Sequence, residues 1–199
     1  MKLQPQRGCT REYCDLDTQK KFFSVSQIRA MMLNPYQGVP ASTLEAARQR
    51  GTLLHTRFWK LLAARGGLCE HPAIIDQYAG QCQAMDAWAE QHQVLPVRLE
   101  EPGCNHLYGY AGTPDAQVRY GPKQILTLVD CKTGTPIRTE AAQMYAYDEM
   151  EGYQSEQLLD LYLREDGTYH EVRRSAKDKS LHWPAFLHAL NILTWRANG

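Results

Sequence analysis

The sequence predicts a domain of the α/β or α+β class, in which helices flank a mixed β-sheet. Residues 24–91 place apolar side chains at helical spacing, and from residue 94 the spacing changes to that of strands. Two more helices follow, one among the strands and one at the end of the chain. The order of helices, three strands, helix, two strands and helix therefore favours one mixed sheet covered by helices.

The bulk composition fits one globular domain. The chain has 199 residues, of which 43% are apolar and 22% are charged. No apolar run reaches the ~18 residues of a membrane helix, and no secretory signal follows Met1, so we expect a cytoplasmic protein without a membrane partner. Residues 1–21 are polar with few apolar anchors, so we expect them to be weakly ordered. The single domain then covers residues 22–199, with a helical layer over 22–93 and a core over 94–199.

Three helices are expected in the first half, over roughly residues 24–33, 42–66 and 72–91. Ser24 or Ser26 caps the first through its hydroxyl. The second opens with a capping box of Ser42 and Glu45 and ends at the glycine pair 66–67. The third begins with Pro72 in its first turn, where a missing N–H costs nothing.

Five strands and two helices are expected in the second half. The strands cover residues 94–100, 108–120, 125–130, 158–163 and 168–172, and the helices cover 138–151 and 181–195. Pro96 favours an edge or irregular position for the first strand. The third strand is apolar on both faces, as a central strand should be. Asp166-Gly167 predicts a hairpin between the last two strands, and Pro184 fits the first turn of the last helix.

The six cysteines predict reduced thiols. They form no C-x-x-C pair, and a cytoplasmic protein keeps its thiols reduced. The alternative is a zinc or iron–sulfur site that uses Cys9, Cys14 and distant partners. The cysteines are Cys9, Cys14, Cys69, Cys82, Cys104 and Cys131.

The charges are divided unevenly along a chain whose net charge is zero. Residues 1–66 hold 11 Lys and Arg against 4 Asp and Glu, whereas residues 67–199 hold 11 against 18. Such asymmetry indicates a polyanionic partner. Solvated helix faces explain it equally well.

Two carboxylates lie where neighbouring strands bring them together. If the turn over residues 121–124 pairs Tyr120 with Ile125, Asp115 lies directly opposite Asp130, with Cβ atoms about 5 Å apart. Carboxylates that close repel each other unless one is protonated or a cation binds both. Mg²⁺ suits the pair, because it takes oxygen ligands from one or two carboxylates and keeps waters for a substrate phosphate.

The residues that follow Asp130 add to this group. Lys132 points to the same face as Asp130, where its ammonium can hold an attacking water and offset charge on a phosphate. Cys131 points away, but its backbone carbonyl remains available as a ligand. An ordinary surface salt bridge of Lys132 with Asp115 or Asp130 is the alternative.

Other polar residues have two interpretations each. Gln143 and Tyr147 lie on one helix face, either at a substrate or as a buried polar pair. His55 borders the apolar stripe of its helix, so it is either a histidine of the core or a metal ligand. Gly51, one turn earlier, costs about 1 kcal/mol relative to Ala and indicates close helix packing or room for DNA. Glu100 is an auxiliary acid near the metal or a solvated strand end.

These motifs resemble the PD-(D/E)xK nuclease superfamily, and within it the RecB-type exonuclease branch. Pro114-Asp115 and Asp130-Cys131-Lys132 match the signature in order and spacing. Gln143-x-x-x-Tyr147 matches the motif that follows it, and Gly51-x-x-x-His55 matches an upstream helix. The resemblance covers about residues 24–195 and is closest to small stand-alone proteins of phages and prophages. It implies a restriction-endonuclease-like core with a central mixed sheet and an N-terminal helical layer that carries His55.

The resemblance also implies roles for these residues. Asp115, Asp130 and the Cys131 carbonyl bind a catalytic Mg²⁺ or Mn²⁺, and Lys132 assists the water. His55 completes the site or binds a second ion. The side chains at 143 and 147 position DNA.

The function expected from the resemblance is a metal-dependent DNA exonuclease that acts on single-stranded ends or tails in replication, recombination or repair. The alternatives are a structure-specific or sequence-specific endonuclease on the same core and a catalytically silent DNA-binding module. Some members of the branch close an iron–sulfur cluster with three cysteines near the C-terminus; none follows Cys131 here, so we expect no such cluster. No helicase segment is present, so we expect the nuclease to act alone or with a separate replication or recombination protein.

Overall fold

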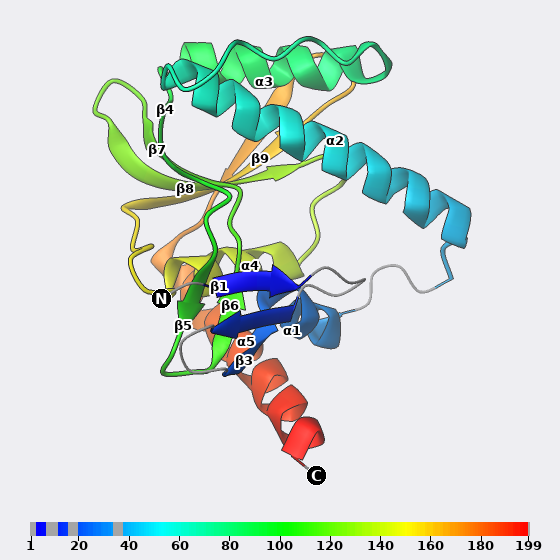
Figure 1. Ribbon diagram of the computed structural model, residues 1–199, viewed down its shortest axis with the longest axis vertical. Coiled ribbons are helices and arrows are strands. Elements are labelled where there is room, and N and C mark those ends of the chain that lie inside the picture. The colour runs from blue at the N-terminus through cyan, green and yellow to red at the C-terminus, as the bar shows by residue number, and fades with distance from the viewer. Residues whose placement is uncertain (1–2, 7–11, 16–19, 34–37, 199) are drawn as a thin grey trace.

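The computed structural model describes residues 3–6, 12–15, 20–33 and 38–198. Over these residues the chain combines helices with two five-stranded sheets, each with parallel and antiparallel neighbours, which confirms the mixed α/β class. Figure 1 shows α2 and α3 on one side of the central sheet and α4 on the other. The helices are α1 (Val25–Met32), α2 (Ala41–Arg65), α3 (Ala79–Gln91), α4 (Thr139–Asp148) and α5 (Ala176–Asn198), with a 3₁₀ turn η1 (Asp76–Tyr78).

The central sheet has the strand order β10-β9-β8-β7-β4. Its strands are β4 (Leu95–Leu99), β7 (Ala116–Tyr120), β8 (Ile125–Lys132), β9 (Gln157–Leu163) and β10 (Tyr169–Arg173). β8 and β9 are parallel and joined through α4, while the other neighbours are antiparallel. β8 is central as expected, and β4 lies at the edge with a register shift after Pro96. The hairpin around Asp166-Gly167 is also confirmed.

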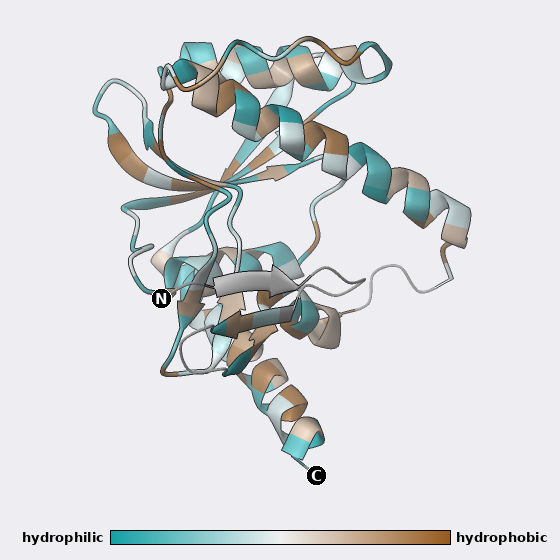
Figure 2. Cartoon of the chain, in the orientation of Figure 1, coloured by the Kyte–Doolittle hydropathy of each residue, from teal (hydrophilic) through white to brown (hydrophobic). Residues whose placement is uncertain are grey.

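The two faces of the central sheet are covered by different cores, and Figure 2 shows apolar stretches on the strands between the helices. Towards α2 and α3, the sheet contributes Val129 and Cys131 to a cluster around Trp88. Towards α4 it contributes Leu128 and Leu158, which pack with residues of α1, α4 and α5. Because successive side chains of a strand point to opposite faces, Asp130 and Lys132 share the α4 face with Leu128.

The second sheet has the order β1-β2-β3-β6-β5. Its strands are β1 (Leu3–Gln6), β2 (Glu12–Asp15), β3 (Lys21–Ser24), β5 (Gly103–Asn105) and β6 (Tyr110–Gly112). The expected continuous strand over residues 108–120 is wrong, because it divides into β6 here and β7 in the central sheet. Pro114 lies at the division, and a residue without an N–H cannot continue a ladder.

Within residues 1–21, for which weak order is expected, the described residues include the strands β1 and β2. Tyr13 is buried, and its hydroxyl lies 2.8 Å from Oγ1 of Thr113. This side-chain contact ties β2 to the segment that precedes Asp115. Residues 1–2, 7–11 and 16–19, with Cys9 among them, lie outside the described residues.

Helix α1 begins as predicted. The Ser24 hydroxyl oxygen accepts a hydrogen bond from the Gln27 backbone N–H, and the Gln27 side-chain oxygen accepts one from the Ser24 backbone N–H. The predicted capping box of α2 is wrong. The helix begins at Ala41 after Pro40, and Glu45 instead accepts hydrogen bonds from Arg48 and Gln49. Among the helices of the described residues, none is both long and apolar enough to cross a bilayer.

Two other helix starts differ from expectation. The helix predicted from Pro72 begins only at Ala79, since Arg57 donates to the carbonyls of Pro72 and Ala73 and holds that segment extended. The last helix starts earlier, at Ala176. Ser175 caps it by accepting from the Asp178 backbone, so Pro184 lies inside the helix.

Candidate active site

The predicted hairpin register places the first residues of the site. Tyr120 pairs with Ile125 and Ala116 with Val129, as expected from the turn between them. The ladder ends there, so Asp115 meets β8 through its side chain rather than as a ladder partner. Its Oδ2 accepts a hydrogen bond of 2.7 Å from the backbone N–H of Cys131.

The Cys131 carbonyl is directed towards the same side as Asp115. The N–H and C=O of one strand residue point to the same neighbour, and the Cys131 N–H points to Asp115. This backbone oxygen, which stays a predicted ligand, therefore lies on the side of β8 that faces Asp115.

Helix α2 brings His55 to Asp115. Nδ1 of His55 lies 3.0 Å from Oδ1 of Asp115, so this carboxylate joins α2 to the end of β8. The negative charge of Asp115 raises the pKa of His55 to about 9, against the opposing effect of burial. Burial alone raises the pKa of Asp115, but the charge and hydrogen bond of His55 hold it below its usual range.

Asp130 and Lys132 form a buried ion pair on the α4 face of β8. Burial raises the pKa of Asp130 to about 6, although the Lys132 ammonium opposes the shift. Oδ2 of Asp130 is the oxygen that contacts the Lys132 ammonium in this ion pair. Burial lowers the pKa of Lys132, but Asp130 and other nearby carboxylates outweigh it and raise that pKa.

Helix α4 covers this ion pair with Gln143. Oε1 of Gln143 accepts from Nζ of Lys132 at 2.9 Å and from Nη1 of Arg29 at 2.5 Å. Its Nε2 donates to the Tyr147 hydroxyl at 3.0 Å, so the two helix positions do form a polar pair. Tyr147 is 5% exposed, and its ring lies where a Cβ on Gly112 would meet it at 2.6 Å.

Asp160 and Arg29 are site residues that sequence reasoning missed. Asp160 is the parallel partner of Asp130 in β9 and is fully buried. Its Oδ2 accepts from Nε of Arg174 at 2.7 Å, while Oδ1 has no hydrogen-bond partner. A lone carboxylate in the apolar run 158–163 was an available signal for Asp160. Arg29 gave no such signal, because its contact with Gln143 spans two distant helices.

Two residues with open interpretations are now placed. A Cβ built on Gly51 meets no atom within 4 Å, so close helix packing is not the reason for this glycine. Glu100 is exposed, and its backbone N–H donates to the Asp115 carbonyl at 3.1 Å. Its backbone therefore supports the segment that carries Asp115.

The donor set fits a hard divalent cation in its chemistry. Two carboxylates and a backbone carbonyl offer the oxygen ligands that Mg²⁺ and Mn²⁺ take. Among the described residues, the donor atoms of His55, Asp115 and Asp130 do not all lie within 4.8 Å of one another. Each carboxylate instead contacts a cation of the protein, His55 or Lys132.

No protein-family model matches this chain, and no curated protein matches it. Among solved structures, it is similar to an alkaline exonuclease (LHK-Exo) from Laribacter hongkongensis. The two chains share 16% identity over 89% of this chain and 93% of the other, with a TM-score of 0.39.

Proposed function

We propose that this protein is a Mg²⁺- or Mn²⁺-dependent nuclease that hydrolyses phosphodiester bonds in DNA, as an exonuclease acting on single-stranded ends or tails. The observation that carries the proposal is the meeting of Asp115, Asp130 and Lys132 at one end of β8. Two carboxylates and a buried ammonium at a strand end match the needs of phosphoryl chemistry: a cation site, and a positive charge for the attacking water and the phosphate.

Each residue has a distinct role in this proposal. Asp115, Asp130 and the Cys131 carbonyl hold the metal, and His55 completes the site or serves a second ion. When bound, the metal supplies Lewis-acid stabilisation of the phosphate and of the leaving oxygen. Lys132 holds the attacking water and is itself held by Gln143, whose Oε1 accepts from it at 2.9 Å.

The substrate strand approaches between α1 and α2 in this proposal. Arg29 and the open space at Gly51 border the site from these two helices. Residues 41–53 of α2 are mostly exposed and carry Arg48. Contacts between basic side chains and DNA phosphates make the affinity for DNA fall steeply as the salt concentration rises. Gln143 and Tyr147 are both buried, so in this proposal they position the DNA phosphate through Lys132, which Gln143 contacts, rather than from the protein surface.

Cleavage of end-labelled oligonucleotides with Mg²⁺ or Mn²⁺ tests the assignment. We expect wild-type protein to degrade a single-stranded end and the variants Asp130→Ala and Lys132→Ala to lose cleavage by about 10²-fold or more. Undiminished degradation by both variants would remove the assignment. Substrates labelled at one end, in both polarities, then give the direction of digestion.

A covalently closed circle separates the exonuclease from an endonuclease on the same core, because only an endonuclease nicks it. A catalytically silent binding module is the second alternative. It is favoured by one observation: each carboxylate is already neutralised within the protein, Asp115 by His55 and Asp130 by Lys132. Calorimetry with Mg²⁺ and Mn²⁺ decides, since a silent module leaves these internal pairs intact and binds neither ion.

A further inference from the structure

A second polar cluster lies outside the candidate active site, where β5 meets the end of α4. Cys104, His106 and Glu151 place one donor atom each within 4.8 Å of the others. Nδ1 of His106 is 3.5 Å from Sγ of Cys104 and 2.7 Å from Oε1 of Glu151. We propose that these three side chains bind one zinc-class divalent ion, with water in the fourth position.

The distances match a tetrahedral site with one small adjustment. Bond lengths of 2.3 Å to sulfur and 2.0–2.1 Å to nitrogen place these two ligands about 3.6 Å apart in a tetrahedron. The observed 3.5 Å between Cys104 and His106 meets that value. Nitrogen and carboxylate oxygen ligands stand about 3.4 Å apart, so Glu151 must retreat by about 0.7 Å. Its side chain is 61% exposed and has room to do so.

The backbone holds the three ligands in place before any ion binds. Cys104 lies in β5 and His106 follows directly after this strand, and the 3.5 Å between Sγ of Cys104 and Nδ1 of His106 places the two side chains on the same side. The Glu151 N–H donates to the Cys104 carbonyl at 2.9 Å, and the Asn105 side chain donates to the Glu149 carbonyl at 2.6 Å. These two bonds fix the end of β5 against the turn after α4. Little ordering is therefore left for the ion to impose.

The donor types select against the ion of the nuclease site. Thiolate and imidazole are ligands for zinc and similar metals, whereas Mg²⁺ takes oxygen ligands. A thiolate and a carboxylate together balance the charge of a divalent ion. Burial, and then the charges of Glu151 and Asp15, raise the pKa of the Cys104 thiol to about 11, so the ion has to displace the thiol proton when it binds. A surface ion pair explains His106 and Glu151 but not the buried thiol at the same imidazole.

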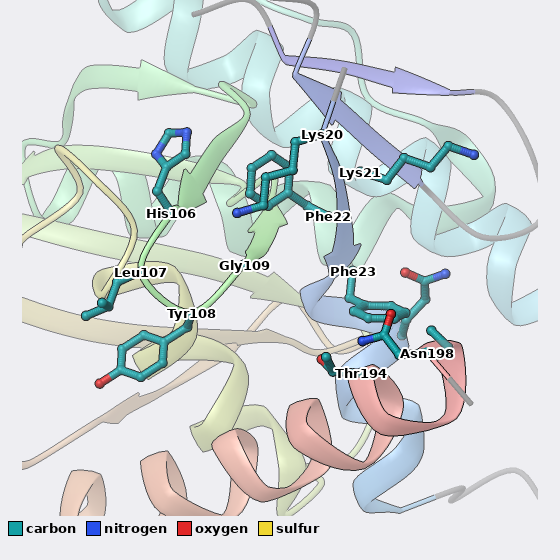
Figure 3. A pocket seen from close by; sticks show the side chains of 12 residues that line it. Lys20, Lys21, Phe22, Phe23, His106, Leu107, Tyr108, Gly109, Thr194 and Asn198 are labelled. Carbon is teal, nitrogen blue, oxygen red and sulfur yellow. The ribbon is translucent and has the colours of Figure 1, made fainter. Parts of the chain in front are cut away.

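Access is provided by a cavity of about 610 Å³ that His106 lines together with Phe22 and Tyr108. Figure 3 shows the His106 ring at one side of this cavity, with Phe22 beside it. The Phe22 ring stands edge-on to the imidazole at a centroid distance of 5.7 Å and restrains its orientation. The ion and its water can thus enter without opening the core.

The ion has a structural role in this proposal. It links an edge strand of the second sheet to the end of α4, and α4 carries the Gln143 that contacts Lys132. Binding therefore raises the melting temperature and holds α4 in register. The site does not depend on nuclease activity, so a protein that cleaves nothing can still bind the ion.

Titration of the full chain with Co²⁺ after chelator treatment tests the site. We expect one equivalent to give a thiolate-to-cobalt charge-transfer band and the strong visible bands of a tetrahedral ion. Zn²⁺ should displace it and raise the melting temperature. Cys104→Ser should abolish the charge-transfer band, and His106→Gln and Glu151→Gln should each weaken Co²⁺ binding by about 100-fold or more.

The controls keep the result interpretable. Cys69→Ser removes an exposed thiol elsewhere, Cys14→Ser removes a buried one on β2, and Asp130→Ala disables the nuclease site. All three should retain the band. His106 and Glu151 are exposed, so their variants should fold and melt like metal-free wild type. Absence of the band in wild type, its survival in Cys104→Ser, or unchanged affinity in both exposed variants overturns the proposal.

Discussion

On the side of β8 that faces α2 and α3, Val129 and Cys131 are fully buried among apolar neighbours. On the side that faces α4, Asp130 and Lys132 occupy the alternating positions and are held by charge and hydrogen bonds. One strand therefore supplies a stabilising core and a polar site at once, because its side chains alternate between two faces. Substitutions on the two sides should separate stability from chemistry.

The largest effect is expected from Asp130→Asn on the polar side. Loss of the carboxylate should lower Mg²⁺-dependent cleavage by about 10³-fold. Burial raises the pKa of Asp130 to about 6 in the folded protein, above its usual value of 3.8. Folding is therefore favoured by the protonated group at low pH, and that contribution is lost as pH rises from about 4 to about 6.

Because Asn cannot ionise, the metal-free variant should lose the fall in melting temperature that wild type shows as pH rises from about 4 to about 6. Thermal melting at several pH values, alongside oligonucleotide cleavage, measures both effects. A variant that keeps this pH dependence of melting and cleaves normally contradicts the comparison.

The next effect is expected on the apolar side. Leu159→Ala in β9 removes a fully buried side chain from the core under α2 and α3 and should cost 2–5 kcal/mol of unfolding free energy. Activity per folded molecule should stay near wild type at low temperature. Urea unfolding measures the cost. Leu95→Ala on the edge strand is the matched control: that side chain is 45% exposed, so its loss should cost less.

Gly51→Ala should raise the stability of the protein and lower its affinity for DNA. Alanine stabilises a helix interior by about 1 kcal/mol over glycine, and its Cβ meets nothing in the protein. The variant should melt higher, yet bind single-stranded DNA more weakly if the strand passes over this turn of α2. Fluorescence anisotropy with a labelled oligonucleotide measures affinity. Ser42→Ala, at the exposed start of the same helix, should leave affinity unchanged; equal affinity for Gly51→Ala would move the DNA path elsewhere.

The smallest effect is a pH dependence of metal binding. Protonated Asp130 cannot bind a cation, so Mg²⁺ affinity should rise with pH up to about 6. The pKa of His55 is about 9, so its ring is charged below that pH and repels the ion. A shallower rise in Mg²⁺ affinity should therefore continue up to about pH 9. Calorimetry in buffers of different ionisation enthalpy counts the protons released. Asp130→Asn should lose the rise in Mg²⁺ affinity that ends at about pH 6, and His55→Gln should lose the rise that continues towards about pH 9.

The local parts of this protein could be predicted from its sequence. The turn over residues 121–124 fixes the β7–β8 register, because a short hairpin leaves one way to pair its strands. That register brings Asp115, Asp130 and Lys132 to one strand end. The starts of α3 and α5 could not be placed, since Arg57 competes with the signal of Pro72 and the Ser175 cap competes with the signal of Pro184.

Alternation along β8 and the hairpin turn were thus enough to place two carboxylates and a lysine together. Only the tertiary structure decided what surrounds them. Asp160 joins Asp130 through a parallel pairing that depends on how α4 crosses the sheet, and Arg29 reaches Gln143 from a helix far away in sequence. The meeting of Cys104 with Glu151 likewise needs the end of α4 beside β5. Turns and alternation act over a few residues, whereas such contacts depend on the packing of whole elements.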